Sequence, residues 1–350
     1  MMNRLLILAC FILIATGLSA QQIDMSMIPY RQGDKWGFSD PGKNVVIAPK
    51  YNEVQWFSEG YAAVKVGSKW GYINKAGKLV IPARYTVAKS FRKGFVPRVG
   101  KEGGDSVLFA GVSIKADGYE NCIDTKGNVT VKCPAIPENS VPENRGPVET
   151  VVTQKNYSVP NNNGLFDKIV DDYKIAGSDE TYYIAEKGGR YGVFNTKFET
   201  IVPFEYDEIK MDKKSASPYL AVKKSGMYGI ATTQGQMKIL PENTNVFAVK
   251  ANDGKEYIIV KKDGKTYVKD MENQLVIPDG YNDIVYDNGG FILTGNDNMR
   301  GYYFIDKTNP AIAPKYTDIK SVNGSNYLMV KTFSGKTGYI SSSGNEYFIE

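Results

Sequence analysis

Short segments of alternating apolar and polar residues recur along most of this chain, and the clearest example lies within residues 57–85. There Ala62, Val64 and Val66 share one side of an extended backbone, the period-two pattern of a half-buried β-strand. Two further apolar segments follow, and the second of them stops at Pro82. We therefore predict three short antiparallel strands, the third ended by the proline because it lacks a backbone donor.

Turn residues repeat at the same spacing as these strands. Residues 74–77, Asn-Lys-Ala-Gly, fit a type I turn whose last residue has a positive φ. Glycine and asparagine tolerate this left-handed conformation, and they hold the equivalent place in most copies. Phe198 holds it in one copy, where we expect a different turn. The equivalent glycines and asparagines are Gly42, Gly77, Gly127, Gly235, Asn273, Asn309 and Gly344.

The whole pattern returns about every 36 residues, in seven clear copies and one or two degenerate ones. A single copy is too small to be stable by itself, so neighbouring copies must pack against one another. The sequence predicts an all-β fold of tandem antiparallel hairpin or meander repeats, stacked as a curved, solenoid-like array. A closed β-propeller is the alternative, although a unit of this length is short for a four-stranded blade. An insertion around residues 101–116 interrupts the third copy.

Residues 1–20 have the composition of a secretory signal peptide, because Arg4 precedes an apolar run that ends in small residues. No later stretch is long enough to span a bilayer as a helix. We expect an exported chain, located in the periplasm, on the outer surface or in the medium. Residues 7–10 loosely resemble a lipobox ending in Cys10, but most of the apolar run follows this cysteine, so we do not expect a lipid anchor. The remainder divides into N-terminal repeats (25–133), a proline-bearing linker that can hold a degenerate repeat (134–164) and C-terminal repeats (165–350).

Charge and composition narrow the function classes. The formal net charge is +5, and it falls by one when Arg4 leaves with the signal peptide. So mild an excess is not the charge signature of a nucleic-acid binder. Histidine is absent, which removes the usual general base and the commonest metal ligand. We expect no metal site, no cofactor and no nucleic-acid partner.

Cys122 and Cys133 are the only cysteines outside the predicted signal peptide. They flank one predicted hairpin, and a turn centred on residues 126–129 would place them opposite each other across its strands. A disulfide is expected in an oxidising compartment, and it would add roughly 3 kcal/mol through loop closure. The alternative is a pair of reduced, partly buried thiols.

Two features are candidates for a binding face. Trp56 is an aromatic residue that the repeat does not require, and local packing between repeats is its alternative role. Lysines recur at one strand position, so stacked copies would align them as a basic stripe that Glu186 interrupts. An ordinary solvated outer face is the alternative for the stripe. The stripe lysines are Lys65, Lys223, Lys261 and Lys331.

Short matches to enzyme motifs fall on ordinary repeat positions. Residues 90–93 fit S-x-x-K and residues 336–338 fit K-T-G, as in serine β-lactamases, but the S-D-N element is missing. Carboxylate pairs for glycoside hydrolysis depend on spatial separation, and no acidic pair stands out from the repeats. We therefore expect no catalytic residues.

Repeat motifs of the Lys-Trp-Gly type are present twice, at Trp36-Gly37 and Trp70-Gly71, with closing segments of the form Ile-x-Pro or Ile-Pro-x-x-Tyr. In these features the chain resembles the WG-repeat family of bacterial proteins, over nearly all of residues 30–350. The resemblance implies an exported or surface-linked β-repeat protein and supplies no catalytic residues to transfer. Glycine recurs at the motif position in Gly192, Gly229 and Gly338.

We predict from these observations an exported, non-catalytic scaffold that binds another protein of the cell envelope or exterior through the extended surface of its repeats. A glycan- or cell-wall-binding module is the alternative, in which Trp56 and other surface aromatics would stack on sugars. An enzyme of unknown type is the third reading. A row of solvent-facing aromatics would favour the glycan-binding module, and two converging carboxylates in a cleft would favour an enzyme.

Overall fold

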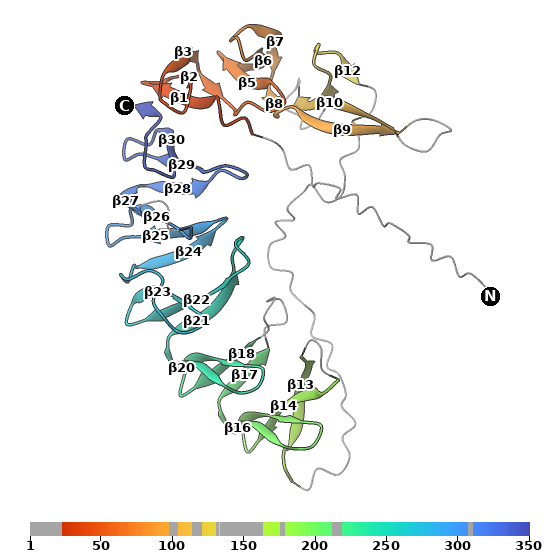
Figure 1. Cartoon of the computed structure of the whole chain (residues 1–350), viewed down its shortest axis with the longest axis vertical. Helices are drawn as coiled ribbons and strands as arrows, with labels where there is room; N and C mark the ends of the chain where they lie inside the picture. The colour runs from red at the N-terminus through yellow and green to blue at the C-terminus, as the bar shows by residue number, and fades with distance from the viewer. Residues whose placement is uncertain are drawn as a thin grey trace, which may run out of the picture. The chain divides into compact units, whose positions relative to one another are not determined.

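A computed structural model describes residues 23–97, 104–113, 121–130, 133, 164–175, 179–211, 219–306 and 311–350. These residues form β-strands in eight small sheets, and none of them forms a helix (Figure 1). The predicted all-β class and the repeated antiparallel sheets are therefore confirmed. The array as a curved solenoid, and the closed propeller as its alternative, remain predictions. The described residues include no helix long and apolar enough to cross a membrane.

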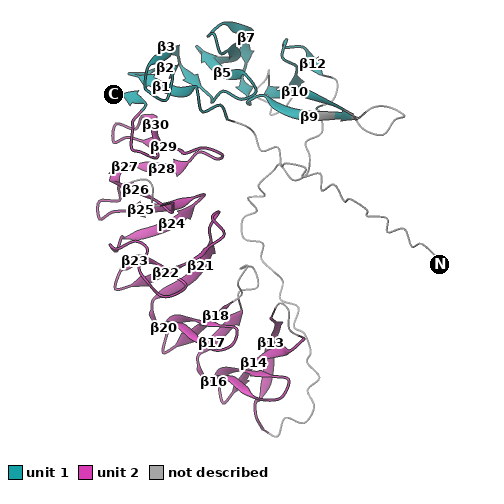
Figure 2. Ribbon diagram, viewed as in Figure 1, with its two compact units in different colours: residues 1–147, 347–350 teal, residues 148–346 magenta. Residues whose placement is uncertain are grey.

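The chain divides into two compact units (Figure 2). Unit 1 comprises residues 1–147 together with 347–350, and unit 2 comprises residues 148–346. The predicted signal peptide lies outside the described residues, as does the predicted linker except for Gly164. Residues 347–350 belong to unit 1, although the sequence placed them with the C-terminal repeats.

Unit 1 contains three sheets, with strand orders β3-β2-β1-β31, β4-β5-β6-β7 and β12-β11-β10-β8, and β9 pairs with β10. The predicted insertion around residues 101–116 includes strand β10, which pairs with β8, β9 and β11. The strands are β1 (Ile28–Gln32), β2 (Lys35–Ser39), β3 (Val45–Tyr51), β4 (Glu53–Val54), β5 (Tyr61–Val66), β6 (Lys69–Asn74), β7 (Leu79–Tyr85), β8 (Val87–Ala88), β9 (Arg92–Pro97), β10 (Gly104–Ser113), β11 (Asn121–Ile123), β12 (Val129–Thr130) and β31 (Phe348–Ile349).

Unit 2 contains five sheets, which follow one another in chain order (Figure 1). Three have four strands, in the orders β13-β14-β15-β16, β17-β18-β19-β20 and β24-β25-β26-β27, and two have three strands, β21-β22-β23 and β28-β29-β30. The strands are β13 (Lys168–Lys174), β14 (Thr181–Lys187), β15 (Arg190–Asn195), β16 (Thr200–Tyr206), β17 (Glu208–Met211), β18 (Tyr219–Lys224), β19 (Met227–Thr232), β20 (Met237–Asn243), β21 (Asn245–Lys250), β22 (Glu256–Lys262), β23 (Lys265–Asp270), β24 (Asp283–Asp287), β25 (Gly290–Thr294), β26 (Arg300–Phe304), β27 (Ile312–Tyr316), β28 (Asp318–Ser321), β29 (Tyr327–Lys331) and β30 (Thr337–Ser341).

A complete repeat has four strands rather than the three that the sequence predicts. The additional strand is the first, and it begins two residues after the tyrosine that closes the preceding repeat: β7 ends at Tyr85 and β8 begins at Val87. The prediction that Pro82 ends a strand is also wrong, because β7 runs through it. This strand lies at the edge of its sheet and Pro82 is exposed, so its missing N–H costs no ladder bond.

The Trp-Gly motif and the closing tyrosine together form a β-bulge. Trp70 on β6 pairs with Tyr85 on β7, while Tyr72 pairs with Ile81, so β7 carries two extra residues between the pairs. The bulged backbone passes directly over Gly71, where an added Cβ would lie 2.6 Å from the carbonyl oxygen of Ile81. The motif therefore needs glycine for close backbone approach, with the tyrosine restoring the register beyond the bulge.

The turn at Phe198 does not differ from the others, contrary to prediction. Its N–H donates to the carbonyl of Asn195 at 3.0 Å, as the N–H of Gly77 donates to Asn74 at 2.9 Å. Phe198 adopts the left-handed conformation itself, with φ of 62°. Its ring is stacked on Phe194, with the ring centroids 5.9 Å apart, and this contact offsets part of the steric cost.

The first repeat places the left-handed residue one position later than the sequence suggests. Lys43, not Gly42, has the positive φ, at 68°, and its N–H donates to the carbonyl of Asp40 at 3.0 Å. Asn309 lies outside the described residues. The remaining predicted turn positions have positive φ, as expected: Gly77, Gly127, Gly235, Asn273 and Gly344.

We expect Lys43→Gly to stabilise unit 1 by about 0.5–1 kcal/mol. It removes a left-handed strain of about 1–2 kcal/mol, and the greater flexibility of the unfolded chain returns about 0.4–1 kcal/mol of that gain. Chemical denaturation followed by tryptophan fluorescence reports on unit 1, because all three tryptophans lie in it. The matched variant Gly77→Lys should destabilise unit 1. A lower denaturation midpoint for Lys43→Gly would contradict the left-handed conformation assigned to Lys43.

Candidate functional site

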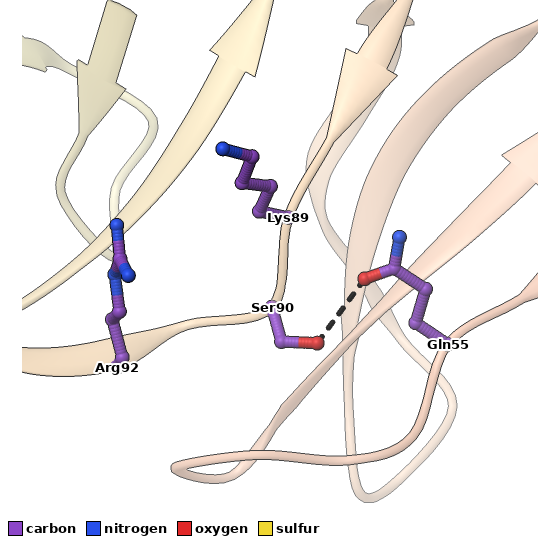
Figure 3. A pocket seen from close by; sticks show the side chains of 4 residues that line it. All are labelled: Gln55, Lys89, Ser90 and Arg92. Carbon is purple, nitrogen blue, oxygen red and sulfur yellow. Dashed lines mark hydrogen bonds between the residues drawn. The ribbon is translucent and has the colours of Figure 1, made fainter. Parts of the chain in front are cut away.

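A polar pocket of about 230 Å³ lies in unit 1, where the first strands of two consecutive sheets lead into the segments that follow them (Figure 3). Gln55 follows β4, Lys89 and Ser90 follow β8, and Arg92 begins β9. The Ser90 hydroxyl donates to Oε1 of Gln55 at 3.1 Å, and Nε2 of Gln55 donates to the carbonyl of Ala88 at 2.7 Å. These bonds fix the amide across the junction between the two sheets.

Two cationic side chains give this pocket its charge. Lys89 and Arg92 both line it, and the Arg92 guanidinium lies 5.0 Å from the centroid of the Phe109 ring. A cation over an aromatic face is held in a defined orientation. Two cations beside an amide and a hydroxyl suit a carboxylate or phosphate group. The S-x-x-K match does not assemble a nucleophile, because Nζ of Lys93 lies 3.8 Å from Glu59 and Ser90 bonds to an amide.

Gln55 and Lys89 occupy a position that recurs in the sheets whose first strand comes from their own part of the chain. Gln55 and Lys89 extend their first strands by the same ladder bond, Gln55 N–H to Ala63 at 2.9 Å and Lys89 N–H to Gly111 at 2.8 Å. Each lies four residues after the closing tyrosine. We call the residues at this register the first-strand row; they are Gln55 and Lys89 in unit 1 and Lys210, Phe247, Val285 and Lys320 in unit 2.

Hydrogen bonds between neighbouring turns align three strands of this row in unit 2. The turns after β21, β24 and β28 carry Asn252, Asn288 and Asn323. Nδ2 of Asn252 donates to Oδ1 of Asn288 at 2.7 Å, and Nδ2 of Asn288 donates to Oδ1 of Asn323 at 2.6 Å. This asparagine ladder holds the ends of three consecutive first strands side by side, so Phe247, Val285 and Lys320 share one face.

The predicted basic stripe is a row of charges set beside acidic or amide neighbours. Lys65 pairs across the strands with Glu53, and its Nζ lies 2.9 Å from Oε2 of that residue. Where Glu186 interrupts the stripe, the pair is inverted, and Lys168 lies 2.8 Å from Glu186. The binding role of the stripe remains a prediction. The residues opposite Lys223, Lys261 and Lys331 are Glu208, Asn245 and Asp318.

Trp56 is buried, with 8% of its surface exposed. Stacking on a sugar needs an accessible ring face, so this residue does not provide the surface platform that the glycan hypothesis requires. Other aromatics are more exposed, above all Phe333 at 83%. Among the described residues, no three acidic or cysteine side chains gather as metal ligands.

Cys122 and Cys133 lie at disulfide distance, with a Cα–Cα separation of 5.2 Å. They are not opposite each other in the ladder, as the sequence suggested, because Cys122 pairs with Thr130. The bond therefore joins β11 to a residue three positions beyond the end of β12. A bonded pair is compatible with an oxidising compartment.

Comparisons with solved structures give long but poor superpositions. The computationally designed Ika8 protein is 11% identical, with 94% of this chain and 88% of that chain covered and a TM-score of 0.26. Hsv2 of Kluyvelomyces marxianus is 9% identical, with coverage of 81% and 89% and a TM-score of 0.24. Dihydro-heme d1 dehydrogenase NirN in complex with DHE is 11% identical, with coverage of 93% and 73% and a TM-score of 0.31. These values carry no argument about fold or function.

A search of curated proteins finds no match. The family described as "WG containing repeat" matches at three places, residues 36–70, 70–97 and 191–228. The first two matches span the Trp36-Gly37 and Trp70-Gly71 motifs, and the third spans Gly192. At these three repeats the structure shows the bulge over the motif glycine. These three segments are therefore WG-containing repeats.

Proposed function

We propose that this chain is an exported, non-catalytic scaffold that binds another protein through its first-strand row. The observation that carries the proposal is the exposure of apolar side chains at this one register in unit 2. Phe247 is 42% exposed and Val285 is 50% exposed. Single exposed apolar residues are ordinary, but their recurrence on aligned strands forms a patch of the kind that mediates protein binding.

The chemistry of the row suggests the partner. Lys210 and Lys320 lie on the same row as the apolar side chains, and Lys89 lies on it in unit 1. Aromatic and aliphatic side chains with basic neighbours suit a protein segment whose apolar side chains are interspersed with acidic ones. In unit 1, the pocket of Lys89 and Arg92 by itself suits a carboxylate. The bonded Cys122–Cys133 pair supports placing the encounter outside the cytoplasm.

The test is cross-linking of the tagged chain in its own cells, followed by mass spectrometry and by binding measurements with the purified candidate. The double variant Phe247→Ser/Val285→Ser should lose the partner and weaken its binding at least about tenfold, as truncation of apolar anchors does. The matched control is Leu240→Ser, because Leu240 is 62% exposed but lies on β20, the last strand of its sheet.

Equal loss with Leu240→Ser would show general surface stickiness and would contradict the proposal. Retention of the partner by the double variant would also contradict it. Retention of the chain on isolated wall or polysaccharide, with no protein captured, would favour the glycan-binding alternative instead.

A further inference from the structure

The first sheet of unit 1 takes its fourth strand from the far end of the sequence. Where the preceding repeat is described, the first strand of a sheet directly follows it, but β1 has residues 348–349 beside it. Strand β31 runs parallel to β1, with Arg31 beside Phe348 and Gln32 beside Ile349. The N–H of Arg31 donates to Tyr347 at 3.2 Å, and the N–H of Gly33 donates to Ile349 at 3.1 Å.

Side chains anchor this short strand more strongly than its few ladder bonds. Tyr347 is 1% exposed, and its hydroxyl donates to the carbonyl of Pro41 at 2.9 Å. Arg31 is 3% exposed, and its guanidinium lies 3.3 Å from Oε1 of Glu350 and 5.4 Å from the centroid of the Phe348 ring. The edge of β1 is thus a built receptor for a segment of the form Tyr-Phe-Ile-Glu.

Nothing in this receptor distinguishes the segment of its own chain from that of another copy. Residue 346 belongs to unit 2 and Tyr347 to unit 1, so the segment is the point at which the chain passes between the units. When the segment leaves, β1 is left with an open edge and Tyr347-Phe348-Ile349 becomes an exposed apolar strand, and both favour pairing with another chain. Exchange of such an element between identical chains re-forms every native contact in a reciprocal dimer.

We propose that the β1 edge also accepts residues 347–350 of a second copy, so that two chains associate by reciprocal strand exchange. The interface consists of the β1 edge, the buried Tyr347 with its hydrogen bond to Pro41, and the ion pair between Arg31 and Glu350. Exchange competes with closure by the chain's own segment, so the exchanged form increases with chain concentration.

The test uses register partners as cysteine reporters, in full chains in which Cys10 is replaced by serine. One chain carries Gln32→Cys and the other carries Ile349→Cys; Cys122 and Cys133 are already bonded to each other. The two chains are unfolded together, refolded at a series of concentrations, oxidised and separated without reductant. We expect a disulfide-linked heterodimer whose fraction rises roughly in proportion to chain concentration at low occupancy.

Two controls complete the experiment. A single chain with both cysteines should form an internal disulfide in dilute solution, and failure to do so would overturn the strand pairing itself. Gln32→Cys mixed with Phe333→Cys reports random oxidation, because Phe333 is 83% exposed and is not a register partner of Gln32. If the Gln32/Ile349 mixture gives no more heterodimer than this control at any concentration, exchange does not occur and the proposal is wrong.

Discussion

Gly71→Ala should lower the free energy of unfolding of unit 1 by about 3 kcal/mol, the upper end of the penalties measured for overpacking. The added methyl would lie 2.6 Å from the carbonyl oxygen of Ile81 and 2.7 Å from the backbone nitrogen of Ala83. Both contacts are with backbone, so no side-chain rotation relieves them, and the bulge of β7 must open. Tryptophan fluorescence during chemical denaturation measures the change, since Trp70 lies beside the substituted residue.

Gly42→Ala is the matched control, because its added methyl would meet only side-chain atoms of Asp40 and Asn44, at 3.2 and 3.3 Å. It should change the midpoint little. A similarly small effect of Gly71→Ala would mean that the bulge is loose and that the motif glycine has another role.

The repeat formed by β21, β22 and β23 offers an independent check, because there the glycine lies in the segment that follows β23. Tyr267 holds the register of Gly71, and a Cβ on Gly280 would lie 2.7 Å from Cε1 of Tyr267. Gly280→Ala should therefore destabilise this sheet when Tyr267 is present and cost little in a Tyr267→Gly background. Hydrogen exchange of residues 256–281 measures the effect of Gly280→Ala in both backgrounds. Additive effects of the two substitutions would contradict the proposed compensation between Gly280 and Tyr267.

The sequence is sufficient to predict the class and the repeat, because both depend on local signals. The alternation in residues 61–66 correctly predicts a strand. The predicted half-burial is wrong, because Ala63 is buried as fully as Ala62 and Val64, and Val66 is 49% exposed. The Trp-Gly motif and the closing tyrosine recur at a spacing that needs no knowledge of the packing. The resemblance to WG-containing repeats rests on the same residues, and the comparison of repeats 36–70, 70–97 and 191–228 supports it.

In unit 1, the first strands β4 and β8 escaped prediction because they are too short to show a period. Glu53–Val54 and Val87–Ala88 have two residues each, fewer than one full alternation. Strand β31 escaped for a different reason, since its partner lies more than three hundred residues away, and no local pattern records such a pairing. The positive φ at Lys43 likewise results from the turn geometry and not from a preference of lysine.

The first-strand row was missed although the sequence contains a signal for it. Gln55, Lys89, Lys210, Val285 and Lys320 each stand four residues after the repeat's tyrosine, and a comparison of copies aligned on that tyrosine reveals the position. Its exposure was not predictable, because burial depends on which strand lies at the edge of the sheet. The same holds for Trp56, whose burial arises from packing that its isolated sequence position does not show.

The second large effect is expected at alkaline pH. Burial raises the pKa of Tyr72, Tyr173 and Tyr302 well above the usual value, and burial together with a hydrogen bond to Asp253 raises the pKa of Tyr257 to about 12. An unfolded tyrosine releases its proton at about pH 10, whereas these remain protonated in the folded chain. Their contribution to stability is therefore complete below about pH 10 and is lost as the pH rises toward the folded values.

Each such tyrosine should lower the free energy of unfolding by about 1.4 kcal/mol per pH unit above about pH 10. Several in one chain should therefore produce a steep, cooperative alkaline unfolding in which the tyrosinate absorbance appears together with the loss of tertiary structure. The variant Tyr72→Phe/Tyr173→Phe/Tyr302→Phe is the decisive comparison. It loses hydroxyl bonds to the carbonyls of Lys89, Thr233 and Asp287, so it should be less stable than the native chain at neutral pH. Its free energy of unfolding should also fall more slowly above about pH 10, because three hydroxyls that ionise only on unfolding have been removed. An unchanged slope would show that these hydroxyls ionise in the folded chain and that the cores between the sheets admit water.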